Sequence, residues 1–368
     1  MKIIYLFFLY LLVSCSVTPD STHPIIEVDL NKCKNISIKS LFSAIQLIPL
    51  ETKAESLIKE LSKIEYFEDN YFILDEALSR ITVFDENGKY KYSIDHSGNG
   101  PEEYINISDF IINKKNRTIE LLSSVNNTVY IWNVKDGSFR EKVILPFLEN
   151  GAYKSFMLQS PDVWVFWTFD YDNRIKYVNN KSYKIVYECF PEKSGDIFSP
   201  YEFSNKNKLC RSLNPNVYNF TESGIAIDYE WRIKGLNNEL HSKKMDQFQT
   251  KKQILDYAKS IFNSEIVDYV IIRQGESDIY QYMQLIRKNK RFSIFRDKRN
   301  ENIYVFDKTK ENININPYYG GDDFMIGTES KDMDISSMIN ESLLDEYNKP
   351  IWNSRREDDN PILIKYIY

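Results

Sequence analysis

The chain has 368 residues, of which 42% are apolar and 14% aromatic, and its formal net charge is −6. Positive residues are scattered along the chain rather than gathered in a basic stripe, which argues against a nucleic-acid partner. The many Tyr and Phe residues favour pleated, half-buried surfaces and therefore β-structure.

The first predicted element is a short apolar segment that follows Lys2. It covers residues 3–13, which is the length of a signal peptide but too short to cross a bilayer, since that takes about 20 residues. The next residues complete the stretch Leu-Val-Ser-Cys, which ends at Cys15 and resembles the lipobox of bacterial lipoproteins. In that family the signal peptide is cut before the Cys, and lipid is attached to the Cys. We therefore expect residues 1–14 to be a signal peptide and Cys15 to be the lipid attachment site; the alternative is an ordinary signal peptide with a chance cysteine.

A polar segment follows the cysteine. Residues 15–24 are expected to form a lipidated tether that holds the globular part off the membrane. Val17 stands where, by analogy, an Asp would favour retention in the inner membrane, so we expect an outer-membrane location. The sequence leaves open whether the protein faces the periplasm or the cell surface.

From residue 25 onward, short apolar runs alternate with turn sequences. Four antiparallel strands joined by tight turns in about 30 residues are typical of one propeller blade. The first set of runs covers residues 64–67, 71–75, 80–85 and 90–94, and Asn87-Gly88 is its strongest hairpin signal. Similar sets predict blades over residues 108–145, 155–190, 201–233 and 269–306, and a sixth that takes 324–327 and 362–367.

The spacing of the repeats supports this reading. Matched strands in the first three sets start near Tyr71, Ile119 and Val163, about 48 and then 44 residues apart, which suits propeller blades. We predict an all-β fold: a single six-bladed β-propeller of four-stranded antiparallel blades over residues 25–368. The segment Ile25–Leu50 is expected to pair into the blade of the C-terminal strand, because such closure removes an open sheet edge.

Two segments carry apolar residues at helical spacing. Residues 251–264 and 335–347 are predicted as short amphipathic helices in loops between strands. We expect each to pack against the edge of the propeller; the alternative is a helix that binds a partner.

The cysteines and histidines do not suggest a metal site. The chain has no CxxC and no HExxH pattern, so we expect neither a metal nor a cofactor. With Cys15 assigned to lipid, Cys33, Cys189 and Cys210 remain. A Cys189–Cys210 disulfide and buried free thiols both stay open.

A loop between the first two predicted blades carries a family resemblance. Ser97–Tyr104 reads SGNGPEEY and resembles the GxGPGEY signature of the six-bladed β-propeller lipoproteins of the Bacteroidetes type, distant relatives of NHL-repeat propellers. Glu102 departs from the pattern, since it stands at the last Gly of the signature. Further similarity lies in the stretches 46–52, 72–75, 83–89 and 358–364. The resemblance covers essentially residues 25–368 and implies a fold and a location but hardly a chemistry. Many members accompany outer-membrane systems that capture and degrade glycans or peptides.

The same loop is the first candidate site. Gly98 and Gly100 could present amides to an anion, but a phosphate loop needs a following helix and usually a Lys. Here Pro101 and a strand follow, and two Glu residues would repel an anion. We therefore assign Gly98, Gly100, Pro101 and Tyr104 to a structural turn.

The third predicted blade holds the candidate ligand-binding residues. Trp167 and Tyr171 are candidates for an aromatic platform that grips a sugar ring or a peptide, although inter-blade core is the alternative. Asp170 and Asp172 have the spacing of a calcium loop but lack its Gly and distal Glu, so a solvated turn is the alternative for them.

No catalytic motif is visible in the sequence. There is no Ser-His-Asp order, no GxSxG and no dinucleotide fingerprint. We expect an outer-membrane-anchored, non-catalytic binding or scaffold propeller that serves glycan or peptide capture, within an uptake complex. The alternative is a polysaccharide-degrading hydrolase or lyase with its site on the axial face, marked by a cluster of desolvated carboxylate, His or Tyr groups.

The lipid assignment is tested by Cys15→Ser. This variant should move from the membrane to the soluble periplasmic fraction, because each buried methylene of the lost acyl chains contributes about 0.8 kcal/mol to anchoring. Cell fractionation followed by immunoblotting measures the change, and Cys33→Ser is the control. A Cys15→Ser protein that still fractionates with the outer membrane would contradict the assignment.

Overall fold

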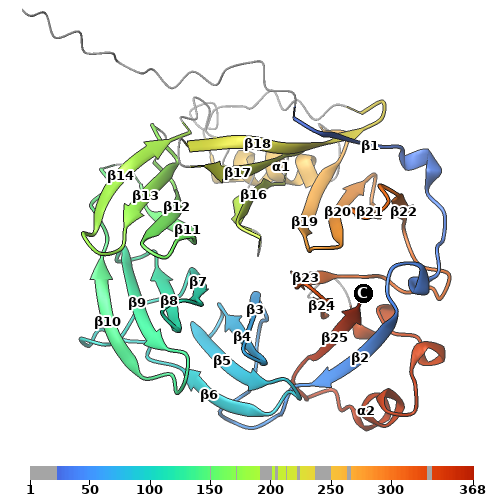
Figure 1. The fold of residues 1–368 in the computed structure, drawn as a ribbon, viewed down its shortest axis with the longest axis horizontal. Coiled ribbons are helices and arrows are strands. Elements are labelled where there is room, and N and C mark those ends of the chain that lie inside the picture. Colours follow the sequence, from blue (N-terminus) through green and yellow to red (C-terminus); the bar gives the residue numbers. More distant parts are fainter. Residues whose placement is uncertain are drawn as a thin grey trace, which may run out of the picture.

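Six β-sheets stand around one axis like the blades of a propeller (Figure 1). This computed structural model describes residues 23–149, 151–170, 172–190, 201–203, 206–212, 214–221, 224–236, 250–262, 267–329 and 334–368. The predicted fold class is therefore confirmed. Cys15 and the predicted signal peptide lie outside the described residues.

Each blade has four antiparallel strands, which follow one another from the axis outward. Blade 1 contains β3 (Lys63–Phe67), β4 (Asn70–Asp75), β5 (Arg80–Asp85) and β6 (Tyr90–Ile94). Blade 2 contains β7 (Asp109–Asn113), β8 (Thr118–Ser123), β9 (Thr128–Asn133) and β10 (Phe139–Ile144). Blade 3 contains β11 (Tyr153–Ser160), β12 (Val163–Thr168), β13 (Ile175–Asn179) and β14 (Lys184–Cys189).

The other three blades follow the same order. Blade 4 contains β15 (Tyr201–Phe203), β16 (Lys208–Arg211), β17 (Asn216–Thr221) and β18 (Gly224–Ile233). Blade 5 contains β19 (Val270–Glu276), β20 (Tyr280–Arg287), β21 (Lys290–Asp297) and β22 (Ile303–Phe306). Blade 6 contains β23 (Pro317–Gly320), β24 (Phe324–Gly327), β25 (Ile362–Ile367) and β2 (Ala44–Pro49).

The hydrophobic core lies between neighbouring blades. In β4 and β8 every residue is buried, because both faces of the sheet are covered by the adjacent blades. The outermost strand β10 is mostly exposed instead, and Val143 is its one buried residue. Apolar runs of four to six residues therefore mark the middle strands, which explains why the sequence located them.

The ring closes through a strand from the N-terminal region. β2 pairs antiparallel with β25, so that Ile48 lies opposite Leu363. The predicted closure is confirmed for Ala44–Pro49. It is wrong for Ile25–Val28, which form β1 and pair in parallel with β18 as a fifth strand of blade 4.

Between these two strands the chain runs along the outside of blade 5 (Figure 1). The Lys34 N–H donates to the Val305 carbonyl at 3.0 Å, and the Ile36 carbonyl accepts from Lys310 N–H at 2.7 Å. Phe42 then packs against the rings of Tyr280 and Tyr366, with centroids 6.2 and 4.9 Å away. The segment from β1 to β2 thus contacts blades 4, 5 and 6.

Two buried asparagines join the C-terminal region to the closing segment. Asn348 accepts from Leu47 N–H at 2.7 Å and donates to the Ile45 carbonyl at 3.0 Å. Asn360, only 3% exposed, donates to the carbonyls of Glu51 and Ser56 and accepts from Ile58 N–H at 2.8 Å. The side-chain amides of Asn348 and Asn360 bond backbone groups that have no hydrogen bond within the β-sheet. The two asparagines therefore hold the loops around the seam in one conformation.

The predicted hairpin at Asn87-Gly88 also touches the seam. Gly88 has φ +80°, and a Cβ there would lie 2.2 Å from the Pro49 carbonyl oxygen. The Gly88 carbonyl accepts from Glu51 N–H at 2.8 Å. Glycine is required at this position both for its dihedral angle and for the close approach of blade 1 to β2.

One of the two predicted helices is confirmed. α1 (Lys251–Phe262) packs through Ile261 against Val267 and Val270 at the start of blade 5. The helix predicted over 335–347 is wrong: two 3₁₀ turns, Ile335–Ser337 and Glu341–Leu343, occupy it, and α2 (Asn348–Ser354) begins later. The side chains of Asp334 and Asn340 accept from the N–H groups two residues on, which caps the N-terminus of each 3₁₀ turn separately. Of the helices that the structure describes, none is long and apolar enough to cross a membrane.

Removal of the Asn360 amide should weaken the closed ring. Asn360→Ala leaves two carbonyls and one N–H without a partner, at about 1–3 kcal/mol each. We expect the free energy of unfolding to fall by about 3 kcal/mol or more in urea titrations. The exposed Asn116→Ala is the matched control, and an equal, small effect of both variants would contradict the role of Asn360.

Candidate functional site

A cavity of about 360 Å³ opens near the axis, among the innermost strands. Its walls are both apolar and polar, and they come from five blades. They comprise Lys63 and Glu65 of β3, residues 111–115, residues 156–161, Asn207 and Tyr319. This cavity is called the axial cavity below.

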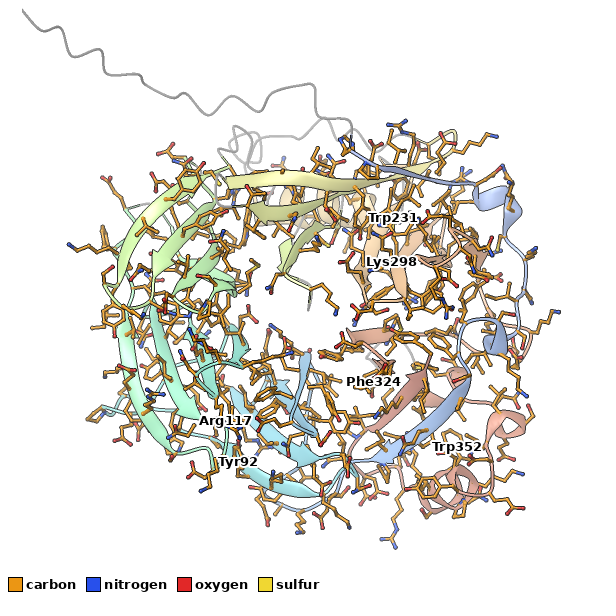
Figure 2. The ribbon with its side chains drawn as sticks, viewed as in Figure 1. Tyr92, Arg117, Trp231, Lys298, Phe324 and Trp352 are labelled. Atoms are coloured by element: carbon orange, nitrogen blue, oxygen red, sulfur yellow. The ribbon has the colours of Figure 1, made fainter. Side chains whose placement is uncertain are left out.

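The fold brings these residues together by strand direction. The turns after the innermost strands reach one end of the axis, and ion pairs between them show that they are neighbours. Arg117, labelled in Figure 2, pairs with Glu68 and joins the turns of blades 2 and 1. Lys206 Nζ lies 2.8 Å from Asp278 and 2.7 Å from Asp322, which joins the turns of blades 4, 5 and 6.

Lys63 is the best-connected charge in the cavity wall. Its Nζ donates to Asp109 Oδ1 at 2.9 Å and to the Phe110 carbonyl at 2.7 Å, and it lies 3.5 Å from Glu65 Oε1. The other oxygen of Asp109 accepts from Phe156 N–H at 2.9 Å. Asp109 therefore links the innermost strands of blades 1, 2 and 3.

The two carboxylates compete for one ammonium. Burial would lower the pKa of Lys63, but the charges of Asp109 and Glu65 outweigh it and raise that pKa. Burial, helped by the charge of Asp109, raises the pKa of Glu65, and Lys63 only partly offsets this. Because Asp109 is closer and also accepts backbone hydrogen bonds, Glu65 is the weaker partner and the more easily protonated acid.

Lys114 and Lys115 line the cavity from the turn after β7 and are exposed. Within the described part of the chain, neither has a carboxylate within 4 Å. At the mouth of the cavity, Lys206 thus forms close ion pairs, whereas Lys114 and Lys115 form none with the described residues and Lys114 acts on Glu65 and Asp322 only at longer range.

The predicted ligand-binding residues of blade 3 lie elsewhere. Trp167 is 3% exposed in the core between blades 3 and 4, and the Arg174 guanidinium covers its ring at 5.2 Å. It therefore offers no surface platform. Tyr171 lies outside the described residues.

Asp170 and Asp172 lie together in the turn after β12, whereas the turn before β12 borders the axial cavity. Asp172 N–H donates to Asp170 Oδ1 at 3.1 Å, and Lys176 Nζ lies 2.7 Å from Asp170 Oδ2. Burial opposes the charged form, but these hydrogen bonds outweigh it and lower the pKa of Asp170. This carboxylate is engaged in its own turn.

The loop Ser97–Tyr104 folds onto itself. Gly98 N–H donates to the Tyr104 carbonyl at 3.0 Å, and Gly100 N–H donates to Glu103 Oε2 at 2.7 Å. A Cβ on Gly98 would lie 2.0 Å from that same oxygen, and the Tyr104 hydroxyl donates to the Ile94 carbonyl. Pro101 lies exposed in the same turn. The two glycine amides that an anion would need are therefore engaged within the loop, one by the Glu103 carboxylate and the other by the Tyr104 carbonyl.

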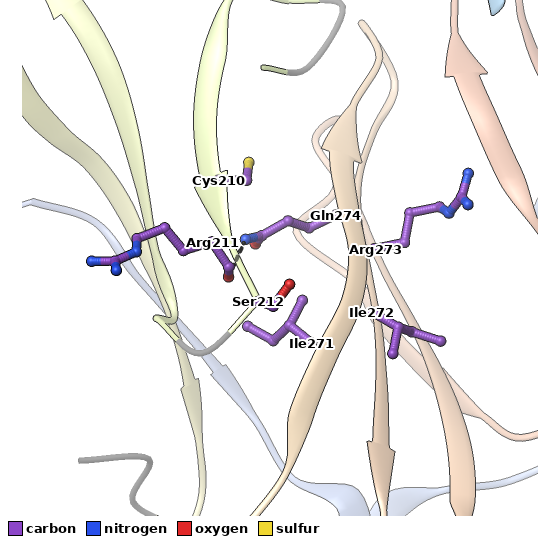
Figure 3. A pocket seen from close by; sticks show the side chains of 7 residues that line it. All are labelled: Cys210, Arg211, Ser212, Ile271, Ile272, Arg273 and Gln274. Atoms are coloured by element: carbon purple, nitrogen blue, oxygen red, sulfur yellow. Dashed lines mark hydrogen bonds between the residues drawn. The ribbon is translucent and has the colours of Figure 1, made fainter. Parts of the chain in front are cut away.

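A second, much smaller cavity lies between β16 and β19 (Figure 3). Its volume is about 10 Å³, which is room for about one water molecule. Gln274 crosses it and donates to the Arg211 carbonyl at 3.2 Å. Cys210 lines this space, and the sulfurs of Cys33, Cys189 and Cys210 are not joined in disulfides. No group of three or more metal-binding side chains occurs among the residues described.

The charged residues of the axial cavity were missed by sequence reasoning. Lys63 and Glu65 are two positions apart on one face of β3, and this alternation of charge on a strand is the signal that could have found them. Lys114-Lys115 looks like any solvated turn, and only the fold shows that it borders a cavity.

The chain is thus a six-bladed β-propeller with a charged cavity at one end of its axis. It belongs to the family described as "Domain of unknown function (DUF4934)", whose profile matches residues 22–366.

Solved structures share the fold. An exported protein of Bacteroides fragilis is 17% identical with a TM-score of 0.71, and the match covers 94% of this chain and 99% of that one. A DUF4221 family member from Bacteroides vulgatus is 10% identical with a TM-score of 0.53, over 89% and 96% of the two chains. No curated protein sequence matches this chain.

The raised pKa of Glu65 predicts a pH effect on stability. Above the ordinary carboxyl pKa of 4.5, the folded protein still holds a proton at Glu65 that the unfolded chain has lost. The free energy of unfolding therefore falls as the pH rises through this window, and Glu65→Gln removes that contribution.

We expect the stability of Glu65→Gln relative to wild type to increase between about pH 4 and 7, measured by urea unfolding. Ser160→Ala, in the same cavity wall but without a titratable group, supplies the baseline. A difference between Glu65→Gln and wild type that stays constant over this range would contradict the assignment.

Proposed function

We propose that this propeller is a binding protein that holds a small polar ligand, or the end of a glycan or peptide, in the axial cavity without converting it. The observation that carries the proposal is the cavity itself. Its volume of about 360 Å³ lies in the range of small-molecule sites. Ile111, Phe156 and Met157 give it apolar walls, while Lys63, Glu65 and the exposed lysines converge on it as polar groups.

The hydrolase or lyase hypothesis remains the second candidate. It is favoured by Glu65, because a raised pKa in a cavity is what a general acid needs. Glycoside hydrolysis uses two carboxylates about 5 to 10 Å apart across the bond. Glu65 is the one carboxylate among the described residues that line the cavity, so the lining supports binding better than hydrolysis.

We also propose that the protein is exported and anchored in the outer membrane through Cys15, as part of an uptake complex. The lipobox-like sequence supports this, and the similar Bacteroides fragilis protein is described as exported. The proposed relationship of this protein to NHL-like propeller lipoproteins is based on the motif Ser97–Tyr104. Cys15 and His23 are eight positions apart in the sequence, a reach of about 28 Å at most. The propeller would therefore stay close to the membrane surface.

Filling the axial cavity tests the binding proposal. Ser160→Trp places an indole at the cavity wall, and Ser40→Trp adds the same group on an exposed 3₁₀ turn outside blade 5. The mature full-length protein is screened against glycans and peptides by calorimetry, with product analysis of the same mixtures. We expect Ser160→Trp to weaken binding at least tenfold and Ser40→Trp to leave it unchanged.

Two outcomes would overturn the proposal. Binding that Ser160→Trp does not affect would place the ligand elsewhere on the protein. Shorter products that disappear with Glu65→Gln would replace binding by hydrolysis or elimination.

A further inference from the structure

We infer that the ligand of the axial cavity is an acidic saccharide, whose terminal sugar carries a carboxylate or sulfate beside its hydroxyl groups. This inference rests on the proposed function and names the class of ligand for the same site. Its basis is the distribution of charge around the cavity.

The positive charges of the cavity wall differ in what surrounds them. Lys63 is compensated by Asp109 at 2.9 Å and by Glu65 at 3.5 Å. Lys206, at the other side of the mouth, is compensated by Asp278 and Asp322. Among the described residues, neither Lys114 nor Lys115 has a carboxylate within 4 Å, although the charge of Lys114 acts on Glu65 and Asp322 from further away. An anion is therefore favoured at the blade 2 side of the cavity and not at the others.

The turn that carries these lysines is held in place. Arg117, at its end, pairs with both carboxylate oxygens of Glu68 in blade 1. Asn116 N–H donates to Asn113 Oδ1 at 3.1 Å, and the Asn113 amide donates to the buried Glu120 at 2.9 Å. The backbone at Lys114 and Lys115 is thus fixed at both ends, so that less conformational entropy is lost when an anion binds.

Next to these lysines, the cavity offers a group that suits hydroxyls. Glu65 can accept hydrogen bonds as a carboxylate, or donate one when it is protonated. Tyr319, which is 8% exposed, borders the same space. Phe156 and Met157 also line the cavity, although their side chains are almost fully buried between blades. An acidic peptide would satisfy the lysines but would leave the hydroxyl-binding side unused.

The test compares acidic and neutral sugars of the same length. Trigalacturonate and a sulfated galactan trimer are the acidic probes, galactotriose is the neutral probe, and tri-glutamate is the peptide probe. Binding to the mature full-length protein is measured by calorimetry at low and high salt. The variants are Lys114→Gln/Lys115→Gln and the matched pair Lys32→Gln/Lys39→Gln, which removes two charges from the exposed segment outside blade 5.

We expect an acidic trimer to bind at least tenfold more tightly than galactotriose, with an affinity that falls at high salt because the charges are screened. Lys114→Gln/Lys115→Gln should abolish most of this preference, and Lys32→Gln/Lys39→Gln should keep it. A preference for trigalacturonate or for the sulfated trimer identifies which anionic group the site takes.

Three results would overturn the inference. Equal binding of acidic and neutral trimers would remove the role of charge while the binding proposal stands. A preference that survives Lys114→Gln/Lys115→Gln would place the anion elsewhere. Lysine-dependent binding of tri-glutamate, with no saccharide bound, would replace the sugar by an acidic peptide. Failure of the binding proposal itself is distinguishable, since ligand binding would then be insensitive to Ser160→Trp.

Discussion

The pairing of β2 with β25 is the interaction on which the rest of the molecule depends. It joins residues more than 300 positions apart and turns a row of six sheets into a ring. The entropy of closing so long a loop grows only slowly with length, but the contact must form late, after the intervening blades exist. Asn348 and Asn360 lie beside this seam. Their side-chain amides form hydrogen bonds with backbone groups that are not bonded within the strand ladder. The shape of the axial cavity depends on this closure, because the cavity is bordered by Tyr319 in blade 6 and by Lys63 in blade 1, and the closed ring brings these two blades together.

The repeated pattern of the blades was readable because each strand carries its own local signal. Middle strands are apolar on both faces, and tight turns such as Asn87-Gly88 separate them. The errors fall where local pattern and long-range packing disagree. The residues Ile25–Val28 have an ordinary strand pattern that does not say which sheet receives them. Tyr318-Tyr319 belong to β23, the innermost strand of blade 6, although the two glycines that follow make the segment look like a loop before the blade. The apolar residues of 335–347 are buried, as they would be on one face of a helix. The backbone that buries them consists of two capped 3₁₀ turns instead.

The candidate site was harder to predict than the fold, for a physical reason. In a propeller both faces of every sheet are covered, so an aromatic cluster such as that around Trp167 usually becomes inter-blade core. The polar residues that face the axis belong to short stretches of sequence, and these stretches lie far apart along the chain. Lys63 begins β3, Lys114 follows β7 and Ser160 ends β11, and these residues line one cavity only because the three innermost strands stand around the same axis. The role of these charged residues can be inferred only when the ion pairs around them are known, and a sequence does not show ion pairs.

The parallel strand β1 has a mechanical consequence. The described chain begins at His23, and Glu230 N–H donates to the Pro24 carbonyl before β1 runs alongside β18. A pull on the preceding residues along the strand loads the hydrogen bonds between β1 and β18 together in shear, so they must break at the same time rather than one by one. The load then passes into blade 4, and the seam between β2 and β25 carries little of it. For a protein tethered to a membrane by its N-terminus, drag on a bound ligand would therefore stress the outer wall of one blade and leave the ring closed.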